Sequence, residues 1–255
     1  MSQAPSIDDI DWSRPWLAPW RPLGEPLAAQ ARLIGVIAAL NAALNAAGRI
    51  RFAEQSELPA GEAYESFIHR TARVPTRANL HDFFNGLAWL AHPALKRRLN
   101  ELQAAELSRA AKGAPRGPVR DALTVFDENA ALLQAPSVLT EALHRRDWHA
   151  LFVTHRAAWA DARLELFGHA LVEKLALPRK AITAHVWLVP PGIGAMSAWV
   201  AQTLEPDRLA GKSFLPLPVL GVPGWWPANE AAVFYRDEVV FRPAQKKTAA
   251  RGPLF

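Results

Sequence analysis

The sequence of 255 residues contains no cysteine. This absence excludes disulfide bonds, thiolate zinc sites, iron–sulfur clusters and cysteine nucleophiles. The chain also has no Gly-x-Ser-x-Gly motif and no glycine pattern of a P-loop or a dinucleotide-binding turn. Neither serine hydrolase chemistry of that type nor nucleotide binding has a motif to support it, and any metal ion must be bound by histidine, aspartate or glutamate.

Signals for export or membrane insertion are lacking as well. Residues 1–10 contain no basic segment followed by an apolar run, so we expect a cytoplasmic protein. The stretch from Ala181 to Leu204 has no charged residue, but Pro190-Pro191-Gly192 divides it into halves that are each too short to cross a bilayer. We therefore predict no membrane span, and instead a buried strand over Ile182–Val189 and a helix over Ala195–Thr203.

The formal net charge is +5, yet no nucleic-acid motif accompanies it. The first basic cluster, Lys96-Arg97-Arg98, lies in a predicted helix close to Glu101 and Glu106, which is typical of a solvent-exposed face. Basic composition without a motif or an aromatic platform argues against a nucleic-acid partner. An unidentified small molecule is the partner that we expect, and the sequence does not indicate the oligomeric state.

Hydrophobic residues recur at helical spacing through most of the chain. We predict a mainly α (α+β) fold in a single domain, 1–255, with an extended arm at 1–25, a mainly helical core at 26–204 and an extended segment and polar tail at 205–255. A short strand is expected at Ile50–Phe52. The expected helices span Pro26–Ala47 with Gly48 as the stop, the segment from the cap Asn79 to Trp89, Pro93 to Leu107, Arg120 into an acidic turn at Asp127–Asn129, Ser137–Arg146, Trp148–Ala160 and Arg163–Leu175.

Tryptophan and proline mark both arms. Trp12, Trp16 and Trp20 are spaced by four residues, but the prolines between them forbid a regular helix. Gly224-Trp225-Trp226 lies in a similar proline-rich segment near the other end. Three exposed indoles would form a large apolar patch, so we predict that the first three tryptophans are buried against the helical core.

The chain resembles the bacterial domain-of-unknown-function family 3025 from about Trp12 to Pro243. The resemblance rests on several motifs in one order: Pro75–Asn85, Arg120–Asn129, Phe167–Lys174, Ile182–His185 and Leu217–Pro227. Ala130 departs from the pattern, because a glycine is expected after the Asp-Glu-Asn sequence. The resemblance implies no reaction, cofactor or partner, so the chemistry must be inferred from the residues.

The first candidate site is a metal centre. His169 and Glu173 lie one helical turn apart and so share a face, and His185 follows on the next predicted element. We expect the three side chains to lie within about 8 Å of one another. Histidines combined with carboxylates suit a divalent transition metal, zinc, manganese or iron, better than magnesium.

A second set of residues could transfer protons without a metal. In this interpretation His81, Asp82, Asp127 and Glu128 are the catalytic acids and bases, and Arg77 and Arg120 bind an anionic substrate. A purely structural interpretation is also open: Asp82 caps a helix, Arg120 pairs with Asp121 or Glu128, and Asp127–Asn129 is a turn.

The functional hypothesis that follows is an enzyme with a histidine and carboxylate site, with metal-dependent hydrolysis as the expected chemistry. The alternative is a non-catalytic binding or adaptor protein. In that case the arms would form its binding surface, and the polar residues would be a structural network.

Overall fold

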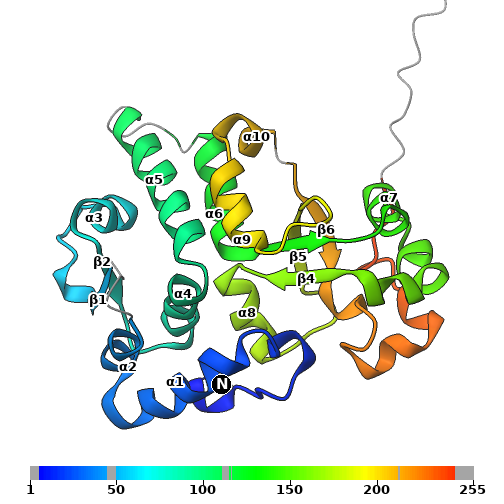
Figure 1. Ribbon diagram of the computed structural model, residues 1–255, viewed down its shortest axis with the longest axis horizontal. Helices are drawn as coiled ribbons and strands as arrows, with labels where there is room; N and C mark the ends of the chain where they lie inside the picture. The colour runs from blue at the N-terminus through cyan, green and yellow to red at the C-terminus, as the bar shows by residue number, and fades with distance from the viewer. Residues whose placement is uncertain (1–5, 45–49, 111–114, 116, 212, 245–255) are drawn as a thin grey trace, which may run out of the picture.

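A computed structural model describes residues 6–44, 50–110, 115, 117–211 and 213–244. The fold is α+β with a helical core, as predicted, and two small sheets (Figure 1). The α-helices are α1 Arg21–Ile34, α2 Val36–Ala42, α3 Tyr64–Thr71, α4 Leu80–Ala91, α5 Pro93–Arg109, α6 Pro118–Asn129, α7 Ser137–Arg145, α8 His169–Ala176, α9 Met196–Thr203 and α10 Pro206–Ala210. The strands are β1 Arg51–Glu54, β2 Arg73–Thr76, β3 Ala130–Gln134, β4 Arg163–Leu166, β5 Thr183–Leu188 and β6 Leu215–Pro218.

The larger sheet has the strand order β4-β3-β5-β6. β3 pairs antiparallel with β4 and parallel with β5, and β5 pairs antiparallel with β6. The smaller sheet is the parallel pair of β1 and β2 beside α3. β3 is buried on both faces, which explains its apolar sequence Ala-Ala-Leu-Leu before Gln134.

Successive residues of β3 face two different hydrophobic clusters. Ala131 and Leu133 join α4, α7 and α8 on one face of the sheet, and Ala130 and Leu132 join α5, α6, α9 and α10 on the other. In Figure 1, α6, α9 and α10 lie above the sheet, and α8 lies below it with the N-terminal segment. The sheet is therefore the middle layer of the molecule.

The three tryptophans of the N-terminal segment are buried, as predicted. Their exposed fractions are 8% for Trp12, 1% for Trp16 and 4% for Trp20. The Trp16 indole donates a hydrogen bond to the carbonyl of Leu175 on α8, at 3.2 Å, and lies against Trp225 of the C-terminal segment. Packing against the core thus accounts for these indoles.

Several predicted boundaries were wrong. The predicted helix 26–47 is two helices, because Gly35 adopts a φ of +84° between α1 and α2, and its expected end at Ala47 and Gly48 lies outside the described residues. Over 148–160 the chain forms a π-helical turn, Ala150–Thr154, and a 3-10 turn, Arg156–Asp161, in place of one α-helix. Residues 127–129, expected to form an acidic turn after the helix, instead form the last helical turn of α6.

The predicted helix Arg163–Leu175 was also wrong in its first part. Residues 163–166 form the edge strand β4, and the helix α8 begins only at His169. Pairing of β4 with β3 satisfies backbone groups that a helix would have satisfied internally. Glu165 therefore lies on a strand, whereas His169 lies on a helix.

Among the described residues, no helix has both the length and the apolar character that crossing a bilayer requires. The strand and helix expected over Ile182–Val189 and Ala195–Thr203 are present as β5 and α9.

Candidate metal centre

Three helix ends meet at one point of the fold. His81 lies in the first turn of α4, His169 is the first residue of α8, and Glu128 lies in the last turn of α6. Helix α8 packs against both α4 and α6. We call the group of His81, Glu128 and His169 the His81 centre; one potential ligand atom from each residue lies within 4.8 Å of the others.

Gly168 allows this close approach. A Cβ atom at this position would lie 2.5 Å from the carbonyl oxygen of Glu128, so any other residue would push α8 away from the end of α6. The Gly168 amide instead donates a hydrogen bond to the carbonyl of Ala130 at 2.8 Å. The glycine thereby brings His169 beside Glu128.

Each imidazole is held through its Nδ1 atom. His81 Nδ1 lies 2.8 Å from Oε2 of Glu173, one turn further along α8, and His169 Nδ1 lies 2.9 Å from the carbonyl oxygen of Asp127. A carbonyl or carboxylate oxygen that holds the Nδ1–H of a histidine is the usual outer partner of a metal-binding imidazole. Both rings are oriented with Nε2 toward the centre.

The two Nε2 atoms face each other at 3.1 Å, and Nε2 of His169 is 3.4 Å from Oε2 of Glu128. With both Nδ1 atoms acting as donors, each neutral ring presents a lone pair at Nε2. Two lone pairs at this distance repel unless a proton or a metal cation lies between them. Tetrahedral ligands at zinc, with bonds of about 2.0–2.1 Å, are separated by roughly 3.3 Å, which is close to both distances.

The pKa values of the two histidines are shifted in opposite directions. Burial lowers the pKa of His169 to about 3, whereas the hydrogen bond to Glu173 raises the pKa of His81. These opposite shifts favour His81 over His169 as the carrier of a proton between the two Nε2 atoms. Burial also raises the pKa of Glu128, with a further contribution from the charge of Asp127.

A buried lysine binds Asp127, the residue whose carbonyl holds His169. The Lys96 ammonium on α5 donates to Oδ1 of Asp127 at 2.6 Å and to Oδ1 of Asn85 at 2.8 Å, and Asn85 in turn donates to the hydroxyl of Tyr64 at 3.0 Å. Burial alone would raise the pKa of Asp127, but the charge of Lys96 and the nearby His169 lower it overall. The residue whose backbone carbonyl holds His169 is thus fixed by an ion pair.

Lys96 contradicts the prediction of a solvent-exposed basic face, because it is 4% exposed. Its neighbours Arg97 and Arg98 are not fully buried, so the cluster divides between the core and the surface. Sequence reasoning also missed Asn85 and Tyr64 as parts of the site. Asn85 stands within the Pro75–Asn85 motif, which was the one available signal.

The structure brings together five of the nine residues proposed from the sequence. The hydrogen bonds and ion pairs just described join His81, Asp127, Glu128, His169 and Glu173. Glu173 and His169 do share one helix, as their spacing indicated, but Glu173 contacts the other histidine. His81 was proposed mainly for proton transfer and His169 for metal binding, and nothing in the chain order shows that α4 and α8 pack together.

Asp82 and Arg77 bond to each other and stabilise the loop before α4. Asp82 is 6% exposed; its carboxylate accepts hydrogen bonds from the Arg77 backbone amide at 2.6 Å and from the Arg77 guanidinium at 3.0 and 3.1 Å. Its own amide is capped by the Asn79 side chain at 2.7 Å. The helix cap is therefore Asn79 and not Asp82, and the Asp82 carboxylate instead fixes Arg77 in the preceding loop.

Arg120 and His185 lie on other parts of the fold. Arg120 is in the first turn of α6, seven residues before Asp127, a span of about 10 Å along a helix. His185 lies in the middle of β5, opposite Ala130, with its ring against Phe214. In the part of the chain that the structure describes, the only group with metal-ligand geometry is the His81 centre, which does not include His185.

The fold and this site define an α+β protein with a histidine and carboxylate cluster where three helix ends converge. The model of a family of proteins of unknown function, domain family 3025, matches residues 50–245, and the chain belongs to this family. Comparisons with curated proteins and with solved structures gave no significant match.

Proposed function

We propose that this protein is a metal-dependent enzyme and that its reaction is a hydrolysis. The observation that carries the proposal is the pair of imidazole Nε2 atoms 3.1 Å apart, each ring being held by an acceptor at Nδ1. A divalent transition metal, zinc, manganese or iron, is the cation that two histidines and a glutamate would bind. Three protein ligands leave a coordination position free, as in catalytic metal sites.

The centre is accessible on one side. The side chain of His169 is 4% exposed, whereas those of His81 and Glu128 are 34% and 32% exposed. A hollow of about 540 Å³ borders Glu173 and is lined also by Lys174 and Arg179, whose charges suit an anionic substrate. A bound metal would supply a Lewis acid and lower the pKa of bound water. The chain's own residues would orient the ligands and exclude water from the buried face of His169.

Metal binding by the purified chain, prepared without a histidine tag, tests the proposal. Metal content is measured as isolated, and zinc and manganese affinities are measured by competition with a chromophoric chelator. We expect His169→Ala to weaken zinc binding by at least about 100-fold, because the loss of a ligand should exceed the roughly 10- to 100-fold effect of losing an outer hydrogen bond. His81→Ala should have a similar effect, and Glu128→Gln a smaller one.

Two histidine variants serve as controls. His144→Ala removes an exposed histidine of α7 and should leave zinc affinity unchanged. His185→Ala separates the ligand set predicted from the sequence from the His81 centre, since only the first requires this residue. Hydrolysis of nitrophenyl esters and phosphates should then depend on the added metal and be lost in His81→Ala. A wild-type chain that binds none of these metals would exclude the metal-dependent function.

A metal-free acid and base site is the second candidate function. It is favoured by the divergent pKa shifts of adjacent groups, with His81 and Glu128 raised and His169 lowered. In this case His81 is the proton donor, and activity survives chelation. Chelator treatment therefore distinguishes the two candidates.

A further inference from the structure

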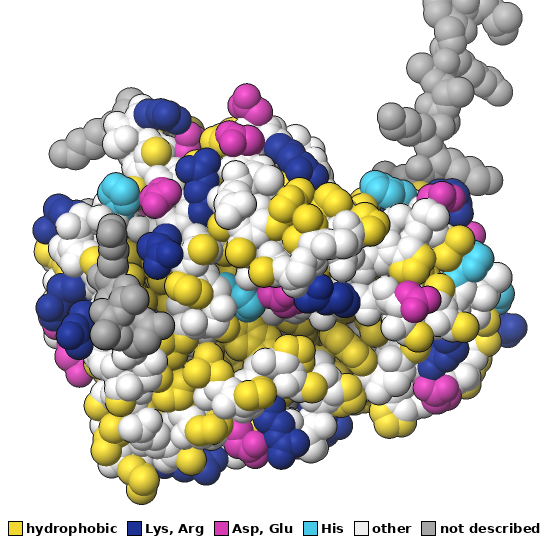
Figure 2. Space-filling model, in the orientation of Figure 1, with side chains coloured by type: hydrophobic (Ala, Val, Ile, Leu, Met, Phe, Trp, Pro, Cys, Tyr) yellow, Lys and Arg dark blue, Asp and Glu magenta, His cyan; other side chains and the backbone are white. Residues whose placement is uncertain are grey.

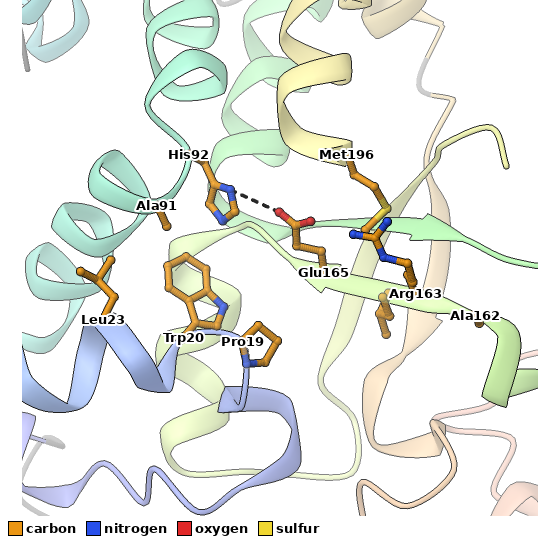
Figure 3. Close-up of a pocket in the computed structure, with 10 residues that line it drawn as sticks. Pro19, Trp20, Leu23, Ala91, His92, Ala162, Arg163, Glu165 and Met196 are labelled. Carbon is orange, nitrogen blue, oxygen red and sulfur yellow. Dashed lines mark ion pairs between the residues drawn. The ribbon is translucent and has the colours of Figure 1, made fainter. Parts of the chain in front are cut away.

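A second histidine and carboxylate pair lies outside the His81 centre. His92 joins α4 to α5, and Glu165 projects from the edge strand β4 (Figure 3). Both line a pocket of about 540 Å³, which we call the His92 pocket, and Figure 2 shows a histidine, an acidic and a basic side chain together in the hollow across the middle of the molecule. This volume is within the range of small-molecule sites, about 300–1,000 Å³.

No hydrogen bond joins the side chains of His92 and Glu165. His92 Nδ1 lies 3.2 Å from Oε1 of Glu165, but the geometry does not form a hydrogen bond, and this nitrogen is buried without a partner. Burial, helped by the charge of Lys96, lowers the pKa of His92 to about 4. The imidazole is therefore neutral near pH 7 and gives Glu165 no cationic partner.

Arg163, two residues away on the same strand, does not neutralise Glu165 either. Its guanidinium donates to the carbonyl oxygens of Ile193 and Gly194, at 3.1 and 3.0 Å, and among the described residues no ion pair joins Arg163 to Glu165. The Glu165 side chain is only 22% exposed, and burial raises its pKa despite the nearby arginine. A carboxylate in this situation lacks a positive charge.

The remaining walls of the pocket are apolar and aromatic. Trp20 lies below His92 and Glu165, with Pro19 beside it, and Met196 lies on the opposite side (Figure 3). The Trp20 ring meets His92 edge to face, with ring centroids 5.4 Å apart. An indole beside an unneutralised carboxylate is a combination that recognises organic cations, since the ring attracts the charge and the carboxylate pairs with it.

We propose that the His92 pocket binds a small organic cation, an ammonium group attached to an apolar or aromatic body. The ammonium pairs with Glu165 beside the neutral ring of His92, and the apolar body lies between Trp20 and Met196. The pocket does not contain any residue of the His81 centre, so this site does not depend on the proposed metal-dependent function.

Calorimetric titration of the full chain with benzylamine, benzyl alcohol and benzoate tests the proposal. The three probes have similar shapes and differ in charge, and a chelator in the buffer prevents the amine from binding a metal. At pH 7 we expect benzylamine to bind at least tenfold more tightly than benzyl alcohol, and benzoate to bind least. Glu165→Gln should weaken benzylamine binding at least tenfold and leave benzyl alcohol unaffected.

Glu141→Gln is the matched control, because it removes a carboxylate from the exposed face of α7. It should leave benzylamine affinity unchanged, as should His169→Ala, which removes the metal site. Circular dichroism spectra and melting temperatures establish that each variant is folded. The proposal fails if benzylamine does not bind, if benzyl alcohol or benzoate binds as tightly, or if Glu165→Gln retains the wild-type affinity.

Discussion

The His81 centre and the His92 pocket use the same residue types in opposite ways. In the centre, both imidazoles are held by an oxygen at Nδ1, and their Nε2 atoms converge with Glu128. In the pocket, Nδ1 of His92 has no hydrogen bond, and the ring beside Glu165 is neutral near pH 7 because burial lowers the pKa of His92. The first arrangement fits a cation that binds several oriented ligand atoms, and the second fits a ligand that brings a positive charge of its own.

The comparison shows that a histidine's role depends on what holds its other nitrogen. Spacing along the chain does not give that information. His81 and His92 belong to the same helix and its cap, yet one donates to a carboxylate of α8 and the other lies beside a carboxylate without bonding to it.

Lys96 connects the two regions. Its ammonium pairs with Asp127 behind the His81 centre, and its charge also lowers the pKa of His92 in the pocket. A single buried cation thus favours the neutral forms of both His92 and His169. Changing it is the strongest test of the comparison.

The largest expected effect is that of Lys96→Met on stability. Removing the ammonium leaves the Asp127 carboxylate and the Asn85 carbonyl without their partner, so we expect unfolding to become easier by about 3 kcal/mol. Chemical denaturation of the metal-free chain measures this change. Arg145→Met, which breaks an exposed ion pair on α7, should cost less than about 0.5 kcal/mol. Equal effects would show that the Lys96 network does not support the site.

The second-largest expected effect is the pH dependence of folding stability that His92 and His169 cause. The pKa of His92 falls from 6.5 in the unfolded chain to about 4 in the folded one. The unfolded state therefore binds more protons between these values, and the stabilising effect of the neutral ring is lost as the pH falls from 6.5 toward 4. Between pH 6.5 and 5 this amounts to about 1.5 kcal/mol for His92. His169, with a pKa near 3, acts in the same direction.

The effect of His81 on stability has the opposite sign. The hydrogen bond to Glu173 raises the pKa of His81, so its stabilising contribution is lost as the pH rises through the pKa of the folded chain. Denaturation curves of wild type and His92→Gln at several pH values separate these contributions. The variant should show a smaller loss of stability between pH 6.5 and 5. An unchanged slope would mean that the pKa of His92 is the same in the folded and the unfolded chain, and the charge balance inferred for the pocket would be wrong.

Much of the fold was predictable from local pattern. The Asn79 cap, the start of α5 at Pro93 and the strand before Pro190 each have a local cause in backbone chemistry, and the structure contains all three. β4 was mistaken for helix because its four residues show no strong period and their pairing with β3 is set by tertiary contacts. The burial of the three N-terminal indoles followed from their size alone.

The site was predictable only in part, for a related reason. Residue types and the helical spacing of His169 and Glu173 indicated the chemistry and one of the elements. The pairing of His81 with His169 depends on the packing of α4 against α8 and on the close approach at Gly168, which are long-range properties. The prediction for Lys96 was wrong because a lysine in a basic cluster is normally solvated, and only the tertiary structure shows that this one is buried and paired with Asp127.

The smallest expected effect is a difference in zinc affinity between substitutions of Glu173 and of Glu165. Glu173 holds Nδ1 of His81 and so should tune the ligand without binding the metal itself. Glu173→Gln keeps the size of the side chain and an oxygen that can accept the hydrogen bond, but it removes the charge that makes the imidazole a stronger ligand. We therefore expect zinc affinity to fall by about tenfold, a smaller loss than that of His169→Ala. Glu165→Gln should leave zinc affinity unchanged, since Glu165 is not part of the His81 centre. Competition titrations of both variants with one chelator at one pH measure the difference. If both substitutions weaken zinc binding equally, the two regions form one site and the distinction drawn from their geometry is wrong.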